Sequence, residues 1–107
     1  MARKVVWTEP AADDLVATVK HISKDSPAFA ATVAQRICDA VDSLAELSQR
    51  GRPFPDPAFP SFRELIVGPY RLVYEVELER VIVHGVFHGS RDVPKHLRGR
   101  GGRRTRG

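Results

Sequence analysis

Three arginines mark the part of this 107-residue chain where chemistry is most expected. The run from Phe62 to Asp92 reads as three successive strands, with Arg63, Arg71 and Arg91 at or near the strand ends. A guanidinium costs a β pattern little when its head reaches water or an anion, and its planar fork suits phosphate and carboxylate. The arrangement indicates either a surface for an anionic or acidic partner, or solvated charge that blocks pairing at sheet edges. On the pattern alone, the second interpretation is favoured.

Histidines and tyrosines form a second group of candidates. His84 and His88 lie four residues apart in one predicted strand, and even spacing places them on one face. Because four strand residues span roughly 13 Å, they are too far apart to bind one metal ion unless the strand contains a bulge, and we predict no metal site. His88 could act as a general base or bind an anion beside Arg91, with structural use as the favoured alternative. Tyr70 and Tyr74 are expected to pack on one strand face.

Composition and cysteine usage set the broad class of protein. The length suits one domain with one core, and no apolar run approaches the roughly 20 residues of a membrane span. The N-terminus has no apolar segment typical of a secretory signal. Cys38 is single, which excludes an internal disulfide, and it is expected to act as a small buried hydrophobe in a reducing cytoplasm. No phosphate loop or nucleophile elbow is present, and no cofactor is predicted.

The positive charge belongs to the C-terminus. Five of the 17 basic residues lie in the last ten positions. The other 12 basic residues and the 13 acidic residues give the rest of the chain a net charge of −1. We therefore expect a domain over residues 1–97 and an Arg/Gly-rich disordered tail over 98–107. The tail either contacts a nucleic-acid backbone or has no specific role.

The elements that would position these groups follow from periodicity. A strand at 3–8 precedes two amphipathic helices, with Thr8 or Glu9 and then Ser26 as caps. The apolar stripe of the second helix is expected to continue to Leu47, with Gly51 as its stop. The remaining predictions are a connector at 52–60 with four prolines, strands at about 61–67, 70–77 and 81–88, and a terminal turn or helix at 91–97.

This order predicts an α+β fold of two layers. The N-terminal strand and a two-helix hairpin would pack on a four-stranded, mainly antiparallel sheet in the order β-α-α-β-β-β. The other sheet face would stay partly open.

Four stretches of the chain resemble one family. They are VVWTEPAADDL, LAEL with the following GRP, FRELIVGPYRLVYEV and VFHGSRDVP. Together they resemble the RelE/ParE superfamily of bacterial toxins from type II toxin–antitoxin systems, over roughly residues 4–97. The pairing of GPYRLVYEV with HGSRD is the more specific part. The resemblance is closer to the ParE branch, often called plasmid stabilisation proteins, and implies a RelE/ParE-like fold.

The two branches imply different mechanisms. RelE-like toxins cleave mRNA on the ribosome with strand lysines and arginines, and often a tyrosine near the C-terminus. Here Arg71 and Arg91 match two basic positions, but the upstream lysines are missing and no tyrosine follows Arg91. If the chain is a ribonuclease, the resemblance implies Arg71 and Arg91 as catalytic residues, and His96, or alternatively Lys95, would substitute for the missing groups. ParE-like toxins are not known as nucleases and poison DNA gyrase, so that cleaved DNA accumulates.

The ParE-like reading implies a target-binding surface and two partners. Arg71 and Arg91 would contact anions of the target or of DNA, while Tyr70 and His88 shape the site; the full predicted set is Arg63, Tyr70, Arg71, His88 and Arg91. A ParD-like antitoxin would form a hetero-oligomer with the toxin, and DNA gyrase would be the target, with no membrane partner. The surface from Asp39 to Glu46 is either part of the antitoxin contact or a solvated face. An inactive, antitoxin-binding relative is a further alternative.

Overall fold

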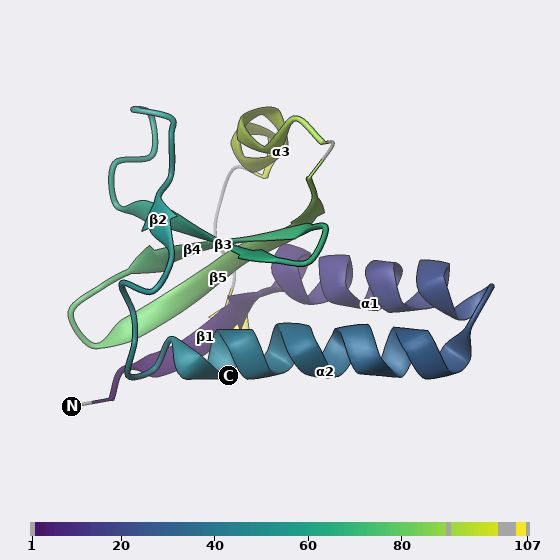
Figure 1. The fold of residues 1–107 in the computed structure, drawn as a ribbon. Coiled ribbons are helices and arrows are strands. Elements are labelled where there is room, and N and C mark those ends of the chain that lie inside the picture. The colour runs from purple at the N-terminus through teal and green to yellow at the C-terminus, as the bar shows by residue number, and fades with distance from the viewer. Residues whose placement is uncertain (1, 90, 101–104, 107) are drawn as a thin grey trace.

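The computed structural model describes residues 2–89, 91–100 and 105–106. One mixed sheet carries helices on both faces, in the strand order β2-β3-β4-β5-β1-β6 (Figure 1). β1 runs parallel to β5, and the other pairs are antiparallel. The long strands are β1 (Lys4–Thr8), β3 (Phe62–Val67), β4 (Tyr70–Val76) and β5 (Arg80–His88); β2 (Arg52–Pro53) and β6 (Thr105–Arg106) are two residues each. The predicted α+β fold is confirmed, and two short strands extend the four predicted ones.

Helices α1 (Glu9–Ser23) and α2 (Pro27–Ser43) begin where the capping residues are. The Thr8 hydroxyl accepts a hydrogen bond from the Ala11 amide at 3.2 Å, and the Ser26 hydroxyl accepts one from the Phe29 amide at 3.1 Å. Each bond satisfies an amide that has no partner within its helix. The predicted caps Thr8 and Ser26 are therefore confirmed.

The second helix is shorter than its apolar stripe indicates. α2 ends at Ser43, and residues 44–50 form turns instead of a further helical turn. The Ser43 hydroxyl donates to the Ala40 carbonyl at 2.6 Å and accepts from Arg50, a local alternative to helical bonding. The prediction that the stripe continues to Leu47 is wrong, since Leu47 is 59% exposed.

A β-bulge changes the pattern of β5. Val73 pairs with Gly85 whereas Tyr74 pairs with Val83, so His84 is an extra residue in the ladder. His84 stacks on Phe62 on one face, while His88 meets the Tyr70 ring on the other. The prediction that His84 and His88 share a face is wrong because the bulge inverts the alternation between them. The turn between β3 and β4 contains Gly68 at φ +57°, a conformation that favours glycine.

The two faces of the sheet bury separate apolar clusters. Under α1 and α2 the core includes Ile37, Val41 and Leu72, all nearly inaccessible to water. On the opposite face α3 (Val93–Gly99) covers a second cluster; its members are Phe54, Phe62, Val73, Phe87, Val93 and Leu97. The face expected to stay partly open is thus covered in part by α3. Asp92 caps this helix, its carboxylate accepting from the Lys95 amide.

The C-terminal segment begins as ordered structure. Arg98 and Gly99 belong to α3, and β6 pairs with the end of β1. Half of the predicted disordered tail, residues 101–104 and 107, lies outside the described residues. Over the described part of the chain, every helix is too short or too polar to cross a membrane.

Candidate functional site

The predicted site residues fall on opposite faces of the sheet. Tyr70 and Arg71 are neighbours on β4, so their side chains point to opposite faces. Tyr70 packs against the helix-side core and pairs with His88, whereas Arg71 pairs with Phe87 on the α3 side. The five predicted target-binding residues therefore do not form one patch, and each is located separately below.

Arg71 belongs to a cluster that we call the glutamate clasp, formed by Arg52, Glu64 and Arg71. The Glu64 side chain is fully buried, and Arg71 binds one of its oxygens through Nε at 2.9 Å and Nη2 at 2.5 Å. Arg52 binds the other oxygen through Nε at 2.7 Å and Nη2 at 2.6 Å. The buried carboxylate is thus compensated from both sides, as a buried charge requires. Arg71 is 20% exposed and Arg52 66% exposed.

Arg63 lies away from the clasp, on the helix side of β3. Its guanidinium donates to the Gly51 carbonyl at 2.6 Å, and the Gly51 amide donates to the Tyr74 hydroxyl at 2.9 Å. A Cβ at Gly51 would lie 2.5 Å from the Glu64 carbonyl oxygen, so only glycine fits there. Burial raises the pKa of the Tyr74 phenol above its ordinary value of 10. Arg63 therefore holds the loop before β2 in the structure.

Tyr70, His88 and Arg91 come together at the end of the sheet nearest α1. They line a hollow of about 500 Å³ that we call the histidine cavity; its lining residues are Asp14, Ala17, Thr18, His21, Tyr70, Val86, Phe87, His88, Arg91, His96 and Arg100. The Tyr70 and His88 rings meet edge to face, with centroids 5.8 Å apart. His96, named above only for the ribonuclease reading, stacks on Phe87 and lines the same cavity.

An ion pair that the sequence did not reveal forms one wall of this cavity. Arg100 binds both oxygens of Asp14 at 2.9 Å and donates to the His84 carbonyl at 2.8 Å. Asp14 also accepts from the Val86 amide at 3.0 Å. Arg100 lies over the Phe87 ring, 4.8 Å from its centroid. The contacts join α1, β5 and the end of α3, which are distant in the sequence.

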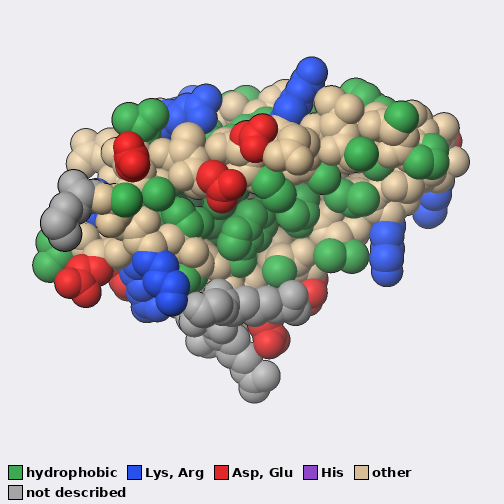
Figure 2. Space-filling view, turned by 90° about the horizontal axis from the view of Figure 1, so that it is seen from below, with side chains coloured by type: hydrophobic (Ala, Val, Ile, Leu, Met, Phe, Trp, Pro, Cys, Tyr) green, Lys and Arg blue, Asp and Glu red, His purple; other side chains and the backbone are tan. Residues whose placement is uncertain are grey.

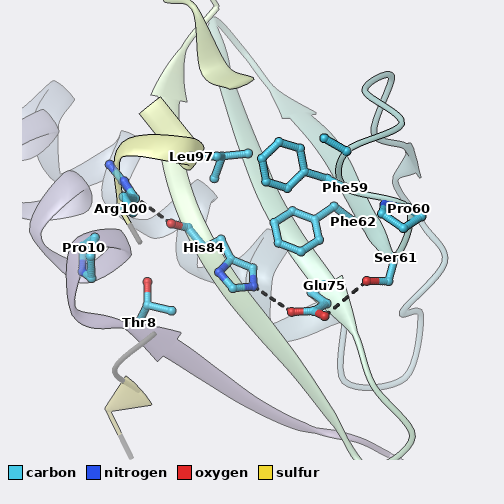
Figure 3. Close-up of a pocket in the computed structure, with 11 residues that line it drawn as sticks. Thr8, Pro10, Phe59, Pro60, Ser61, Phe62, Glu75, His84, Leu97 and Arg100 are labelled. Carbon is cyan, nitrogen blue, oxygen red and sulfur yellow. Dashed lines mark hydrogen bonds and ion pairs between the residues drawn. The ribbon is translucent and has the colours of Figure 1, made fainter. Parts of the chain in front are cut away.

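A second, smaller hollow of about 250 Å³ lies on the other side of Arg100. Figure 3 shows Glu75 between Ser61 and His84, with Oγ of Ser61 at 3.2 Å and Nε2 of His84 at 3.0 Å. The serine hydroxyl donates to the carboxylate and not to the imidazole. A serine nucleophile needs the imidazole as its base, so this order does not provide nucleophilic catalysis.

Metal and thiol chemistry find little support in the described residues. They contain no group of three or more histidine, cysteine, aspartate or glutamate side chains that could hold a metal ion. Cys38 is half-buried on α2, and burial, reinforced by Asp42 and Asp39, raises the pKa of its thiol. A thiol with a raised pKa is a weaker nucleophile at neutral pH.

The family follows from comparison with known proteins. A family model described as the ParE toxin of the type II toxin–antitoxin system parDE matches residues 5–93. The chain belongs to the ParE toxin family. Toxin RelE2 of Caulobacter vibrioides is 39% identical over 89 residues, covering 82% of this chain and 97% of that protein. Putative toxin Y4kP of Sinorhizobium fredii is 39% identical over 100 residues, covering 91% and 100%.

Solved structures agree on the fold. The chromosomal ParDE system of P. aeruginosa gives a TM-score of 0.70 at 24% identity, covering 81% of this chain and 96% of that one. The RelBE2 toxin–antitoxin complex of Mycobacterium tuberculosis gives 0.58 at 24% identity, covering 82% and 99%. This ParE-family chain is thus a type II toxin of the RelE/ParE superfamily, and its relatives carry names from both branches.

Proposed function

We propose that this toxin arrests growth by poisoning DNA gyrase and that a cognate ParD-like antitoxin neutralises it. The glutamate clasp is the observation that favours DNA gyrase over ribosome-bound mRNA as the target. Cleavage of RNA needs cations that stabilise negative charge developing on the phosphate. In this chain Arg71 already binds the buried Glu64 through Nε and Nη2, so its positive charge is neutralised within the fold. A binding toxin needs no such cation at this position.

The histidine cavity is the surface that we assign to the target. Arg91 is exposed there, and none of the ion pairs formed among the described residues includes it. Tyr70 and His88 form the wall beside it. Exposed arginine next to aromatic side chains is typical of contact surfaces for acidic proteins and nucleic acids.

A ribosome-dependent ribonuclease is the second candidate. Arg91 and His96 line the same cavity, which would bring a cation and a base together. Arg71, the third residue of that predicted set, extends on the α3 face into the glutamate clasp. The ribonuclease hypothesis therefore depends on Arg91 and His96 without Arg71.

The outer face of the helix hairpin is the surface that we assign to the antitoxin. Figure 2 shows apolar side chains along this face, and Val16 and Phe29 are 50% and 55% exposed. Acidic residues Asp39 and Asp42 lie exposed on α2. An apolar band with charged neighbours suits a segment that folds as it binds. We expect Val16→Glu to abolish neutralisation, while Leu78→Glu, at an 88% exposed turn residue, leaves it intact. Equal neutralisation of both variants would move the antitoxin to another face.

The deciding experiment is a DNA cleavage assay with purified toxin, DNA gyrase and supercoiled plasmid. Linear DNA should appear only with gyrase and disappear when saturating antitoxin is added. The same toxin preparation is given to translating ribosomes, and mRNA ends are mapped by primer extension. New mRNA ends from a growth-arresting preparation that leaves gyrase unaffected would replace the gyrase proposal with the ribonuclease one.

A further inference from the structure

Three of the four histidines in the chain line the histidine cavity, and they come from three elements. His21 lies on α1, His88 on β5 and His96 on α3, and all three are exposed. Separate elements have thus brought together side chains that can each donate a hydrogen bond. Arg91 lies between β5 and α3 and adds a permanent positive charge.

The acidic side chain in the described lining is already compensated. Asp14 receives two hydrogen bonds from Arg100 and one from the Val86 amide. Its charge therefore balances that of Arg100, and Arg91 remains as the net charge of the lining. An anion entering the cavity would meet a positive field with hydrogen-bond donors from several directions.

We propose that the histidine cavity binds phosphate groups. Guanidinium and imidazole donors match the acceptor oxygens of a phosphate, and the hydroxyls of Tyr70 and Thr18 add neutral donors at the wall. The volume of about 500 Å³ holds more than one phosphate. A metal-mediated site is not supported, because these histidines are not among any set of described residues able to hold an ion.

The phosphate has two sources, a free phosphorylated ligand or the backbone of nucleic acid. This inference deepens the proposed function and rests on it for its biological meaning, since DNA is present wherever gyrase acts. Phosphate binding itself is measured without gyrase. If the toxin binds phosphate but has no effect in the cleavage assay, the phosphate site stands and the gyrase proposal fails. If the toxin is active in the cleavage assay but binds no phosphate, the gyrase proposal stands and the phosphate site fails.

The test uses the full chain and pyrophosphate in isothermal titration calorimetry. Arg91→Ala should weaken binding about tenfold, because one charge-assisted hydrogen-bonding group is lost. His21→Ala, on a different element, should weaken it about threefold through the loss of one donor. Arg36→Ala, an exposed arginine on α2 away from the cavity, removes the same charge and should leave affinity within about twofold. Circular dichroism spectra establish that each variant is folded.

Competition identifies the source of the phosphate. If labelled duplex or single-stranded DNA binds and pyrophosphate displaces it, the cavity takes the nucleic-acid backbone, and binding should weaken with added salt. If pyrophosphate binds and DNA does not compete, the ligand is a free phosphorylated molecule. Absence of saturable pyrophosphate binding at millimolar concentration, or an equal loss in Arg36→Ala and Arg91→Ala, would overturn the proposal.

Discussion

The glutamate clasp and the histidine cavity begin at adjacent residues, Arg71 and Tyr70, yet they treat arginine in opposite ways. In the clasp, a fully buried carboxylate binds Arg52 and Arg71 within the chain. In the cavity, Arg91 is exposed beside histidines, and the carboxylate of Asp14 is bound by Arg100. The comparison shows that an arginine's role depends on whether a carboxylate of the same chain faces it. Residue type and strand position alone do not define a binding residue.

The largest effect is expected from removing the carboxylate of the clasp. Glu64→Ala should lower the free energy of unfolding by about 3 kcal/mol, the lower end for breaking a buried pair, because both arginines keep some contact with water. Urea denaturation measures the change. Glu46→Ala, at an exposed position, should change stability by less than about 0.5 kcal/mol. A similar value for Glu64→Ala would mean that the clasp is not a structural ion pair.

The second prediction separates the two arginines by readout. Arg71→Ala should cost about 2 kcal/mol of stability, because Glu64 keeps only Arg52, but toxicity per folded molecule should persist. Arg91→Ala should leave stability within about 0.5 kcal/mol and reduce toxicity about tenfold. Growth arrest, normalised to soluble toxin, is compared with melting temperature. Full toxicity of Arg91→Ala would remove this residue from the target surface.

The sequence predicted the elements better than the contacts between them. Thr8 and Ser26 indicate the starts of α1 and α2 because capping depends on residues close in the sequence. Gly68-Pro69 indicates the turn between β3 and β4 in the same local way. The bulge at His84 has a weaker local signal: Gly85 indicates a kink in the strand, but the position of the extra residue is fixed by pairing with another strand. The end of α2 at Ser43 depends on the path of the chain towards β2. The apolar stripe continues past Ser43 in the sequence, so it does not indicate this end.

The candidate site was predictable in part. Tyr70, His88 and Arg91 were named from strand position, and the structure brings them to one cavity. Glu64 was not among the predicted site residues, because its burial against Arg71 arises from packing between neighbouring strands. The pair of Asp14 and Arg100 joins residues 86 positions apart, and no pattern in one sequence reports such a contact.

The third prediction tests whether Tyr74 holds the loop that supplies Arg52. Burial raises the pKa of the folded phenol above 10, so the unfolded chain loses the proton first. The contribution of Tyr74 to stability should therefore be constant below about pH 10 and fall above it, by up to about 1.4 kcal/mol per pH unit. Tyr74→Phe should lose about 1–2 kcal/mol at neutral pH, since the Gly51 amide loses its acceptor, and should lose this alkaline slope. Tyr70→Phe is the control and should keep the slope; an unchanged slope in Tyr74→Phe would contradict the assignment.

The smallest effect concerns the wall of the cavity. A chain ending at Gly99 should be less stable than one ending at Arg100 by about 1 kcal/mol, because Asp14 loses an ion pair that is about one-fifth exposed. Thermal denaturation of the two truncations isolates this residue from the remaining tail. Toxicity assays of the chain ending at Arg100 then report what the residues after it contribute. Equal melting temperatures would show that Arg100 adds nothing to the fold.

The extra residue in β5 decides which side chains of that strand line each of the two hollows. One inserted residue determines the sheet face to which each later side chain of β5 points. Phe87 therefore points to the α3 side, and His88 points to the side covered by α1 and α2. Deleting His84 would change no chemistry at Val86, Phe87 or His88, but would exchange the sides to which they point. Inserting or deleting one residue in a strand can therefore change the side chains on a toxin surface more than several substitutions would.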